Sequence, residues 1–239
     1  MQLVFLKLLI RKEGVIYHGG LLRFFHGFRV KETLQAKYHF PVAALNDGKA
    51  AALAELATGH LKGVTNGAAL VLGSGLGGGI IINGKLFQGS HFQAGELTFL
   101  LPLQMEKLDL SLMQGTTLSA IGLITKVNEI LASLDLKDGL LAFKAINAKK
   151  EAVYPIFETY CRNLAITILN LQTIFDMETF VLGGGISAQS ILIEEVNRQF
   201  DKVHHEIDFI GKIIKRPKIV ACHHNGTNLI GAAYFLKQG

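Results

Sequence analysis

The feature of this sequence that most constrains its fold is a cluster of glycines at residues 73–79, GSGLGGG, which lies between two apolar runs. Glycine loses more conformational freedom on folding than any other residue, so such a cluster indicates a backbone path that side chains would obstruct. The flanking runs, residues 68–72 and 79–83, have the length and composition of buried strands. Asn83-Gly84 then predicts a two-residue hairpin into a further strand. We therefore expect the glycines in a turn that connects one strand to another.

This position between two strands excludes two common phosphate-binding motifs. A P-loop needs Gly-Lys-Ser or Gly-Lys-Thr at the start of a helix, and a dinucleotide fingerprint needs a helix after its glycines. The backbone N–H groups of a glycine turn can still form a nest for a phosphate, because no side chain blocks its approach. The alternative is a tight hairpin that binds nothing. The residues concerned are Gly73, Ser74, Gly75, Gly77 and Gly78.

Helical and strand patterns alternate along the rest of the chain. Periodicity and composition predict helices over residues 30–38, 49–61, 118–131, 139–148, 152–175, 187–200 and 229–237. Short apolar runs predict strands over residues 42–45, 180–182 and 218–222. Ser187 is expected to cap the helix that runs to about Phe200. This alternation predicts a fold of the α/β class.

The composition indicates a buried core, because 49% of the 239 residues are hydrophobic and 18% are charged. The net charge of +5 comes from Lys and Arg residues spread along the sequence. Their densest groups, Lys149-Lys150 and Lys212 with Lys215-Arg216, have no interleaved aromatic residues on which bases would stack. We therefore expect no nucleic-acid partner.

The N-terminal residues and the cysteines argue against a membrane or secreted protein. The apolar run at residues 3–10 is interrupted by Lys7, is too short to cross a bilayer and leads to no cleavage site. Cys161 and Cys222 are too few for a disulfide framework and lack metal-ligand spacing, which fits a reducing compartment. We expect a cytoplasmic protein without a membrane partner.

Asp47 is the first candidate for a catalytic residue. Together with Asn46 it follows the predicted strand at residues 42–45, at the carboxyl end where open α/β sheets bind ligands. A carboxylate there can take a proton from a substrate hydroxyl group. It can also cap the helix that follows, which is the more frequent role of a single Asp. The two roles are compatible.

A second glycine cluster, Gly183-Gly184-Gly185, follows the predicted strand at residues 180–182 and precedes a helix. Three glycines there would let a flat ligand such as adenine lie against the backbone, and the alternative is a crowded turn between strand and helix. Taken together with Asp47 and the first glycine turn, this cluster predicts nucleotide-dependent phosphoryl transfer. In that chemistry a protein mainly positions the reactants and stabilises charge.

Five motifs, in their order and spacing, resemble the ROK family of bacterial sugar kinases and sugar-responsive repressors. These motifs are residues 46–52 (NDGKAAA), 73–79, Gly95-Glu96, 182–187 (LGGGIS) and 228–233 (NLIGAA). The resemblance implies the actin-like, ribonuclease H-like ATPase fold with two domains. Residues 1–63 would form one domain, with residues 229–239 packed back on it as a terminal helix, and residues 64–228 the larger domain.

Carried over to this sequence, the resemblance implies that Asp47 deprotonates the sugar hydroxyl group that attacks ATP. It also implies that Asn46 and Glu96 hold sugar hydroxyls, and amide and carboxylate groups suit such donors and acceptors. His91 and Gly20 would lie on the sugar side, although a single His is more often structural. The resemblance implies Mg2+ with ATP, the glycines of both clusters at the nucleotide, and a possible homodimer.

Two departures from the family concern metals and charge. Thr98-Phe99 and LLPLQMEKLDL stand where zinc-binding members carry a His and cysteines, so we expect no structural zinc. This pattern resembles the zinc-less subgroup of beta-glucoside kinase-like and hexose kinase-like proteins. Lys49, where the family usually has Asn, adds a positive charge near Asp47 that would lower its pKa or disturb the sugar pocket. The adjacent pairs His204-His205 and His223-His224 are expected at the surface.

The start of the chain departs most, because nothing there matches the family's first phosphate turn, Asp-x-Gly-Gly-Thr. Residues 13–20 already resemble a point inside the first domain, which predicts an N-terminally truncated copy with that domain incomplete. The leading hypothesis is an ATP-dependent kinase of a hexose or glucoside, inactive in this chain if the first turn is essential. The alternatives are a non-catalytic sugar-binding regulator or remnant of the family, and an unrelated nucleotide-binding α/β protein. The sequence does not name the sugar.

Overall fold

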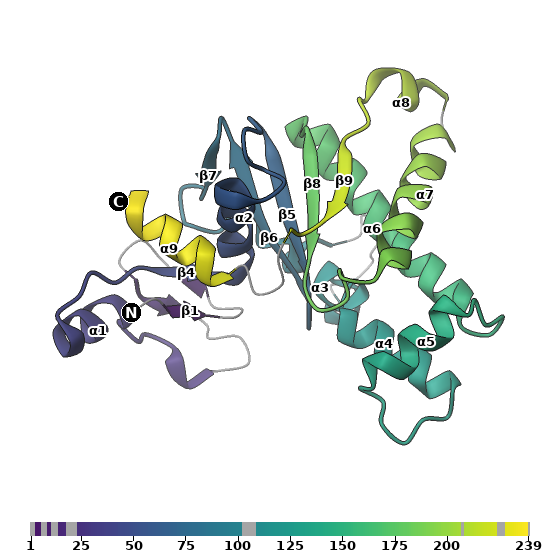
Figure 1. Ribbon diagram of the computed structural model, residues 1–239, viewed down its shortest axis with the longest axis horizontal. Helices are drawn as coiled ribbons and strands as arrows, with labels where there is room; N and C mark the ends of the chain where they lie inside the picture. The colour runs from purple at the N-terminus through teal and green to yellow at the C-terminus, as the bar shows by residue number, and fades with distance from the viewer. Residues whose placement is uncertain are drawn as a thin grey trace.

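The computed structural model describes residues 3–5, 9–10, 14–17, 23–101, 109–206, 208–223 and 228–238. Its largest element is a five-stranded sheet in the centre of the molecule (Figure 1). The strands in spatial order are β7 (Lys85–Phe87), β6 (Leu76–Ile82), β5 (Gly67–Leu72), β8 (Thr179–Gly183) and β9 (Lys218–Ala221). β5, β8 and β9 are parallel, whereas β6 and β7 run antiparallel to their neighbours. The expected mixture of hairpin and α/β connections is therefore present in one sheet.

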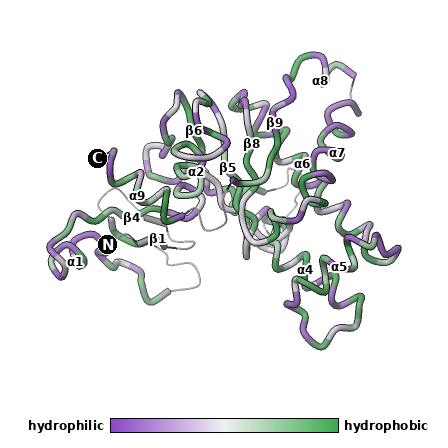
Figure 2. Tube along the Cα trace, in the orientation of Figure 1, coloured by the Kyte–Doolittle hydropathy of each residue, from purple (hydrophilic) through white to green (hydrophobic). Residues whose placement is uncertain are grey.

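Helices cover both faces of this sheet, and the alternation of side chains in β5 follows from that. Ala68, Leu70 and Leu72 pack in the main core, whereas Ala69 and Val71 pack in a smaller core on the other face. Successive side chains of a strand point to opposite faces, so a strand buried on both faces is apolar throughout. Figure 2 shows the same apolar character along β8 and β9.

The main core lies between the sheet and a group of helices on the right of Figure 1. These helices are α4 (Ala120–Ile130), α5 (Gly139–Asn147), α6 (Tyr154–Phe175) and α7 (Ser190–Glu206), followed by the short α8 (Asp208–Ile213). Shorter helical segments precede them in the chain, namely η2 (Leu97–Phe99), η3 (Leu110–Leu112) and α3 (Gln114–Thr117). Within the described residues, no helix has the length and apolar character needed to cross a bilayer.

The other face of the sheet is covered by α2 (Asp47–Thr58), and α9 (Asn228–Gln238) packs on α2 from outside. The two helices cross closely, because an added Cβ at Gly231 would lie 1.8 Å from the carbonyl oxygen of Ala50. Tyr234 and Phe235 of α9 pack against Leu53 of α2 in a small apolar cluster. A helix buried between two elements needs apolar residues on most of its surface.

The segments before α2 form small elements on the left of Figure 1. Strand β1 pairs in parallel with β4, and β2 pairs antiparallel with β3. The elements are β1 (Leu3–Phe5), β2 (Leu9–Ile10), β3 (Ile16–Tyr17), η1 (Arg23–Phe25), α1 (Val30–Tyr38) and β4 (Ala44–Asn46). β4 leads directly into α2, so the end of the small sheet lies next to the large one.

Several expectations about local structure are confirmed. α1 spans residues 30–38 as predicted. The hairpin between β6 and β7 has Asn83 at φ 52° and Gly84 at φ 69°, the left-handed pair that such a turn requires. The other predicted helices and strands are present with ends shifted by a few residues.

Three local predictions were wrong. The turn after β5 contains only residues 73–75, because β6 begins at Leu76 and the remaining glycines lie inside that strand. Ser187 does not cap α7, which begins at Ser190, since its hydroxyl group donates to the carbonyl of Gly184 at 2.8 Å. α7 also continues to Glu206 and buries His204, which stacks on Phe200 instead of lying at the surface. His205 is exposed as expected, and His224 lies outside the described residues.

Candidate functional site

Most of the predicted site residues lie at one edge of the large sheet. β5, β8 and β9 are parallel, so their carboxyl ends meet at this edge. β5 leads into the turn at residues 73–75, β8 into the second glycine cluster, and β9 into Cys222. Open α/β sheets bind ligands outside the carboxyl ends of their strands. Gly20, expected on the sugar side, lies outside the described residues.

Asn46 and Asp47 join β4 to α2, and their side chains have different local roles. Asn46 is the N-cap, because its Oδ1 accepts hydrogen bonds from the backbone N–H groups of Gly48 at 2.9 Å and Lys49 at 3.4 Å. Asp47 is the first residue of the helix and is 7% exposed. The capping role considered for Asp47 therefore belongs to Asn46.

Asp47 lies beside the glycines of β6. A Cβ built on Gly77 would be 3.7 Å from the Oδ1 atom of Asp47. Asp47 Oδ1 also accepts a hydrogen bond from the backbone of Gly48 at 2.9 Å. The candidate base and the first glycine segment are thus neighbours in space, although 30 residues separate Asp47 from Gly77 in the sequence.

Three glycines bring α2 and the loop before η2 against opposite sides of the β6 backbone. A Cβ on Gly48 would lie 2.5 Å from the nitrogen of Gly78, and a Cβ on Gly78 would lie 2.6 Å from the oxygen of Gly95. Gly95 has φ +85°, which also favours glycine. The missing side chain of Gly78 therefore makes room for the backbone of Gly95, and the missing side chain of Gly48 lets α2 approach the backbone of Gly78. A role of Gly78 at a phosphate remains a prediction.

This packing brings Lys49 and Glu96 together in the interior. The Lys49 Nζ atom lies 3.9 Å from Glu96 Oε1 and donates a hydrogen bond to the backbone oxygen of Phe92. The side chain of Lys49 is 4% exposed and that of Glu96 is 20% exposed. His91, in the same loop, is exposed.

Burial dominates the titration of this ion pair. It raises the pKa of Glu96 to about 6, against the opposing effect of Lys49 and with a further increase from the charge of Asp47. Burial lowers the pKa of Lys49, and the charge of Glu96 opposes that change. Two carboxylates and one ammonium group thus share a site at the start of α2. Sequence reasoning noted the charge of Lys49 but not its contact with Glu96.

The glycines expected at a nucleotide fall into two kinds. Gly73 and Gly185 border open space, since a Cβ at either would meet nothing within 4 Å. Gly184 has φ +100°, and a Cβ there would lie 2.1 Å from the oxygen of Leu72. Gly183 has ordinary contacts, and Ser74 is exposed in the first turn next to Gly75. The open space at Gly73 and Gly185 is what the close approach of a ligand to the backbone requires.

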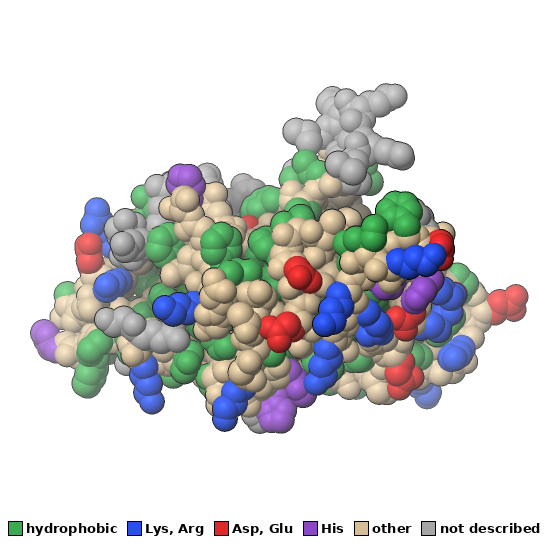
Figure 3. Space-filling model, turned by 90° about the horizontal axis from the view of Figure 1, so that it is seen from above, with side chains coloured by type: hydrophobic (Ala, Val, Ile, Leu, Met, Phe, Trp, Pro, Cys, Tyr) green, Lys and Arg blue, Asp and Glu red, His purple; other side chains and the backbone are tan. Residues whose placement is uncertain are grey.

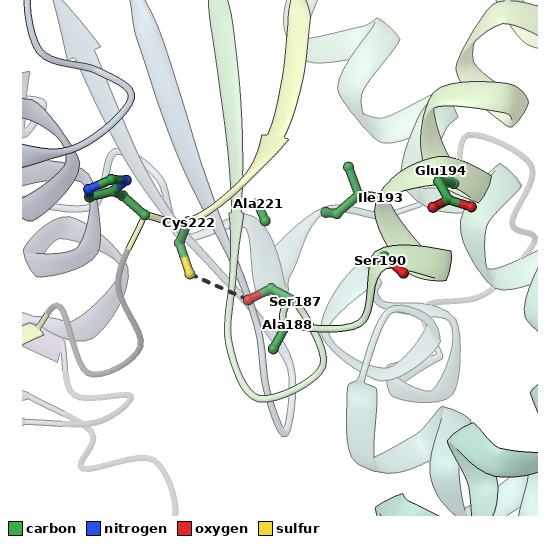
Figure 4. Close-up of a pocket in the computed structure, with 8 residues that line it drawn as sticks. Ser187, Ala188, Ser190, Ile193, Glu194, Ala221 and Cys222 are labelled. Carbon is green, nitrogen blue, oxygen red and sulfur yellow. Dashed lines mark hydrogen bonds between the residues drawn. The ribbon is translucent and has the colours of Figure 1, made fainter. Parts of the chain in front are cut away.

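A pocket of about 490 Å³ opens beside the second glycine cluster (Figure 4). In its wall the hydroxyl group of Ser187 and the thiol of Cys222 are hydrogen-bonded to each other at 3.4 Å, and Glu194 projects from α7 (Figure 4). Its size is typical of small-molecule sites. Sequence reasoning found the glycines but missed Glu194 and Cys222, although Cys222 is the last residue of the strand predicted over residues 218–222 and directly follows β9 in the structure. The pocket is lined by Ser187, Ala188, Ser190, Ile193, Glu194, Ala221, Cys222 and His223.

The described residues include no group of three or more His, Cys, Asp or Glu side chains arranged to hold a metal ion. On the face seen in Figure 3, Lys and Arg side chains are interspersed with Asp and Glu. The described side chains on that face therefore form no single-sign patch of the kind that is typical of a nucleic-acid interface.

Comparison with known proteins gives consistent matches along the sequence. The sequence matches the model of the ROK family over residues 8–239. It is 31% identical over 236 residues to a beta-glucoside kinase of Listeria innocua serovar 6a, in a match that covers 95% of this chain and 75% of that protein. A glucokinase of Halalkalibacterium halodurans is 27% identical in a gapped alignment 243 residues long. The match covers 94% of this chain and 72% of the glucokinase.

Solved structures agree with the sequence matches. A ROK family protein from Streptococcus pneumoniae TIGR4 in complex with sucrose has a TM-score of 0.81 and 29% identity, covering 97% of this chain and 77% of that one. A ROK family glucokinase from Streptomyces griseus in complex with glucose and AMPPNP has a TM-score of 0.82 and 22% identity, and the match covers 97% of this chain and 79% of the glucokinase chain. The latter similarity concerns the fold alone. The expected α/β class and actin-like ATPase fold are confirmed.

Proposed function

Because the chain belongs to the ROK family, we propose that it is a sugar kinase that transfers the γ-phosphate of ATP to a hydroxyl group of a hexose or a glucoside. The observation that supports this most directly is the position of Asp47. Its buried carboxylate lies beside Gly77 at the start of β6, and its charge acts on Glu96 of the Lys49–Glu96 pair. In this proposal the backbone of the glycine segment binds phosphate, and Glu96 binds hydroxyl groups of the sugar.

In this proposal Asp47 takes the proton from the reacting sugar hydroxyl. A general base is most effective when it is held within hydrogen-bonding reach of that proton, and the first turn of a buried helix supplies a rigid support. Glu96, with a pKa of about 6, is mostly ionised at neutral pH and accepts hydrogen bonds from sugar hydroxyls. Asn46 and His91 lie at the start of α2 and in the loop that carries Glu96, so we assign them to the same side.

The residues that border open space fit a nucleotide. Gly73 and Gly185 would let phosphate and ribose approach the backbone, with Ser74, Gly75 and Gly77 completing the first turn and the beginning of β6. The pocket that Ser187 and Cys222 help to line has room for the adenosine part. ATP would supply the phosphoryl group when bound. The Mg2+ that accompanies ATP usually binds to the phosphates of the substrate and to one or two carboxylates of the protein. Asp47 is the carboxylate beside Gly77, at the beginning of β6.

The experiment that tests this proposal is an assay of sugar-dependent ADP formation with Mg2+ and ATP over a panel of hexoses and beta-glucosides. We expect Asp47→Asn to lower kcat by about 10²- to 10⁴-fold, because the amide accepts no proton. The exposed Glu151→Gln is the matched control and should leave the rate unchanged.

The outcomes separate the candidate functions. Turnover that disappears in Asp47→Asn supports the kinase and the role of Asp47. Turnover that persists in this variant overturns the role of Asp47. A chain that binds a panel sugar by calorimetry but forms no ADP would instead be a non-catalytic sugar-binding protein of the family.

A further inference from the structure

We infer that Lys49 is a positioning residue, which holds the Glu96 carboxylate and the loop at residues 91–96 in the arrangement that binds the sugar. This inference rests on the proposed function of the site. The side chain of Lys49 is 4% exposed, and its ammonium group already has two protein partners, the backbone oxygen of Phe92 and the carboxylate of Glu96. Lys49 therefore acts through the groups that it touches.

Lys49 fixes the loop at two points. Its ammonium group donates to the backbone oxygen of Phe92 and lies 3.9 Å from the carboxylate of Glu96, four residues further on. Phe92 has φ 61°, a left-handed conformation that is unfavourable for a residue with a large side chain. A hydrogen bond from a buried charged group to its carbonyl helps to hold the loop in that conformation. The long side chain thus connects the first turn of α2 to the loop across the glycines of β6.

Lys49 also balances the charges of the site. Among the residues that the structure describes, the charged groups that act on Glu96 are Lys49 and Asp47 of α2, and Gly78 of β6 meets the loop at Gly95 without a side chain. Two carboxylates in a buried site disfavour each other's ionised form, and a cation beside one of them favours the ionised form of that one. Without Lys49 we expect Glu96 to take up a proton at a higher pH. A protonated Glu96 has lost the charge that strengthens its hydrogen bonds to sugar hydroxyls.

The test compares Lys49→Met, which keeps the approximate length without the charge, with Lys49→Arg, which keeps the charge. Lys62→Met, an exposed lysine beyond the end of α2, is the matched control. Binding of D-glucose and methyl beta-D-glucoside is measured by calorimetry without nucleotide between about pH 5 and pH 8. For the wild type we expect the affinity for sugar to fall as the pH is lowered, with a midpoint near the Glu96 pKa of about 6. Circular dichroism and thermal melts establish that each variant is folded.

We expect Lys49→Met to weaken binding at pH 7 by at least about tenfold, because it removes a hydrogen bond from a charged group. The midpoint of the pH dependence should also rise in Lys49→Met. In Lys49→Arg, which keeps the charge, both the affinity and the midpoint should be close to those of the wild type. A purely structural role would weaken binding at every pH without moving the midpoint. Unchanged affinity and an unchanged midpoint in a folded Lys49→Met variant would overturn the inference.

A second measurement keeps this test separate from the test of the proposed function. The titration of the Glu96 carboxyl carbon is followed by NMR in the sugar-free chain, assigned with Glu96→Gln. A higher midpoint in Lys49→Met supports the link between Lys49 and Glu96, and the same midpoint as the wild type contradicts it. If the wild type binds neither sugar probe, the proposed function fails, and this titration still decides whether Lys49 governs the charge of Glu96.

Discussion

Gly184 and Gly185 are adjacent in the sequence, yet the structure requires glycine at the first and only permits it at the second. Gly184 has φ +100° and no room for a Cβ beside the oxygen of Leu72. Gly185 has open space where its side chain would be. A glycine can therefore accommodate either the chain itself or a ligand, and its residue type does not distinguish the two.

We predict that Gly184→Ala lowers the free energy of unfolding by about 3 kcal/mol, because it combines left-handed strain with a clash against rigid backbone. Gly185→Ala should change it by less than about 0.5 kcal/mol. Urea denaturation measures both. If a nucleotide lies against Gly185, this second variant should also bind AMPPNP more weakly, whereas wild-type AMPPNP affinity would remove Gly185 from the proposed nucleotide site.

At the scale of elements, α6 and α7 are joined by a polar network around a buried carboxylate. Glu195 accepts hydrogen bonds from Tyr154 at 3.0 Å and from Gln199 at 2.7 Å, and it forms an ion pair with Arg198. Burial raises the pKa of Glu195, but the hydrogen bonds from these three partners outweigh it and leave the pKa below its ordinary value. The carboxylate form of Glu195 therefore stabilises the packing of α7 on α6.

The sign of its pH dependence follows from that direction. A carboxyl group whose pKa is lower in the folded than in the unfolded chain stabilises the fold above the unfolded pKa, about 4.3, and loses this effect as pH falls through the folded pKa. We predict that Glu195→Gln costs about 1–2 kcal/mol at pH 7. The difference in the free energy of unfolding between Glu195→Gln and the wild type should become smaller below about pH 4.

The measurement is urea denaturation of both proteins from pH 7 down to pH 3. Glu129→Gln, at an exposed position of α4, is the control and should follow the wild type at every pH. A difference between Glu195→Gln and the wild type that stays constant with pH would contradict the role assigned to the charge.

At the scale of the whole molecule, Glu55 connects α2 to the segment that follows β9. Its Oε1 accepts the backbone N–H of His223 at 2.7 Å, and its Oε2 accepts that of His60 at 2.8 Å. Glu55 is 1% exposed, so both oxygens satisfy backbone groups from which water is largely excluded. The crossing of α9 over α2 is in line with the proposed grouping of residues 229–239 with residues 1–63, which remains a prediction. The contact of Glu55 with His223 instead joins the two proposed domains. The homodimer also remains a prediction.

We predict that Glu55→Ala lowers the free energy of unfolding by about 2–4 kcal/mol, because two backbone N–H groups lose the acceptors that the buried Glu55 carboxylate supplies. Glu55→Gln retains the shape and one acceptor oxygen, and should cost about half as much. Both are measured by urea denaturation, with the exposed Glu151→Ala as the control. A Glu55→Ala variant as stable as the wild type would show that other groups satisfy these donors.

The sequence by itself determined the α/β class, α1, the hairpin at Asn83-Gly84 and the buried strands, because each depends on backbone preferences and side-chain periodicity within a few residues. It also singled out Asp47 and Glu96, through motifs whose order resembles a known family. Where the glycine turn ended and why His204 is buried were decided by neighbours far away in the sequence. Only the tertiary structure brought Gly48, Gly78 and Gly95 into contact. That contact pairs Lys49 with Glu96, since the charge of a buried group depends on what packing places beside it and not on its position in the chain.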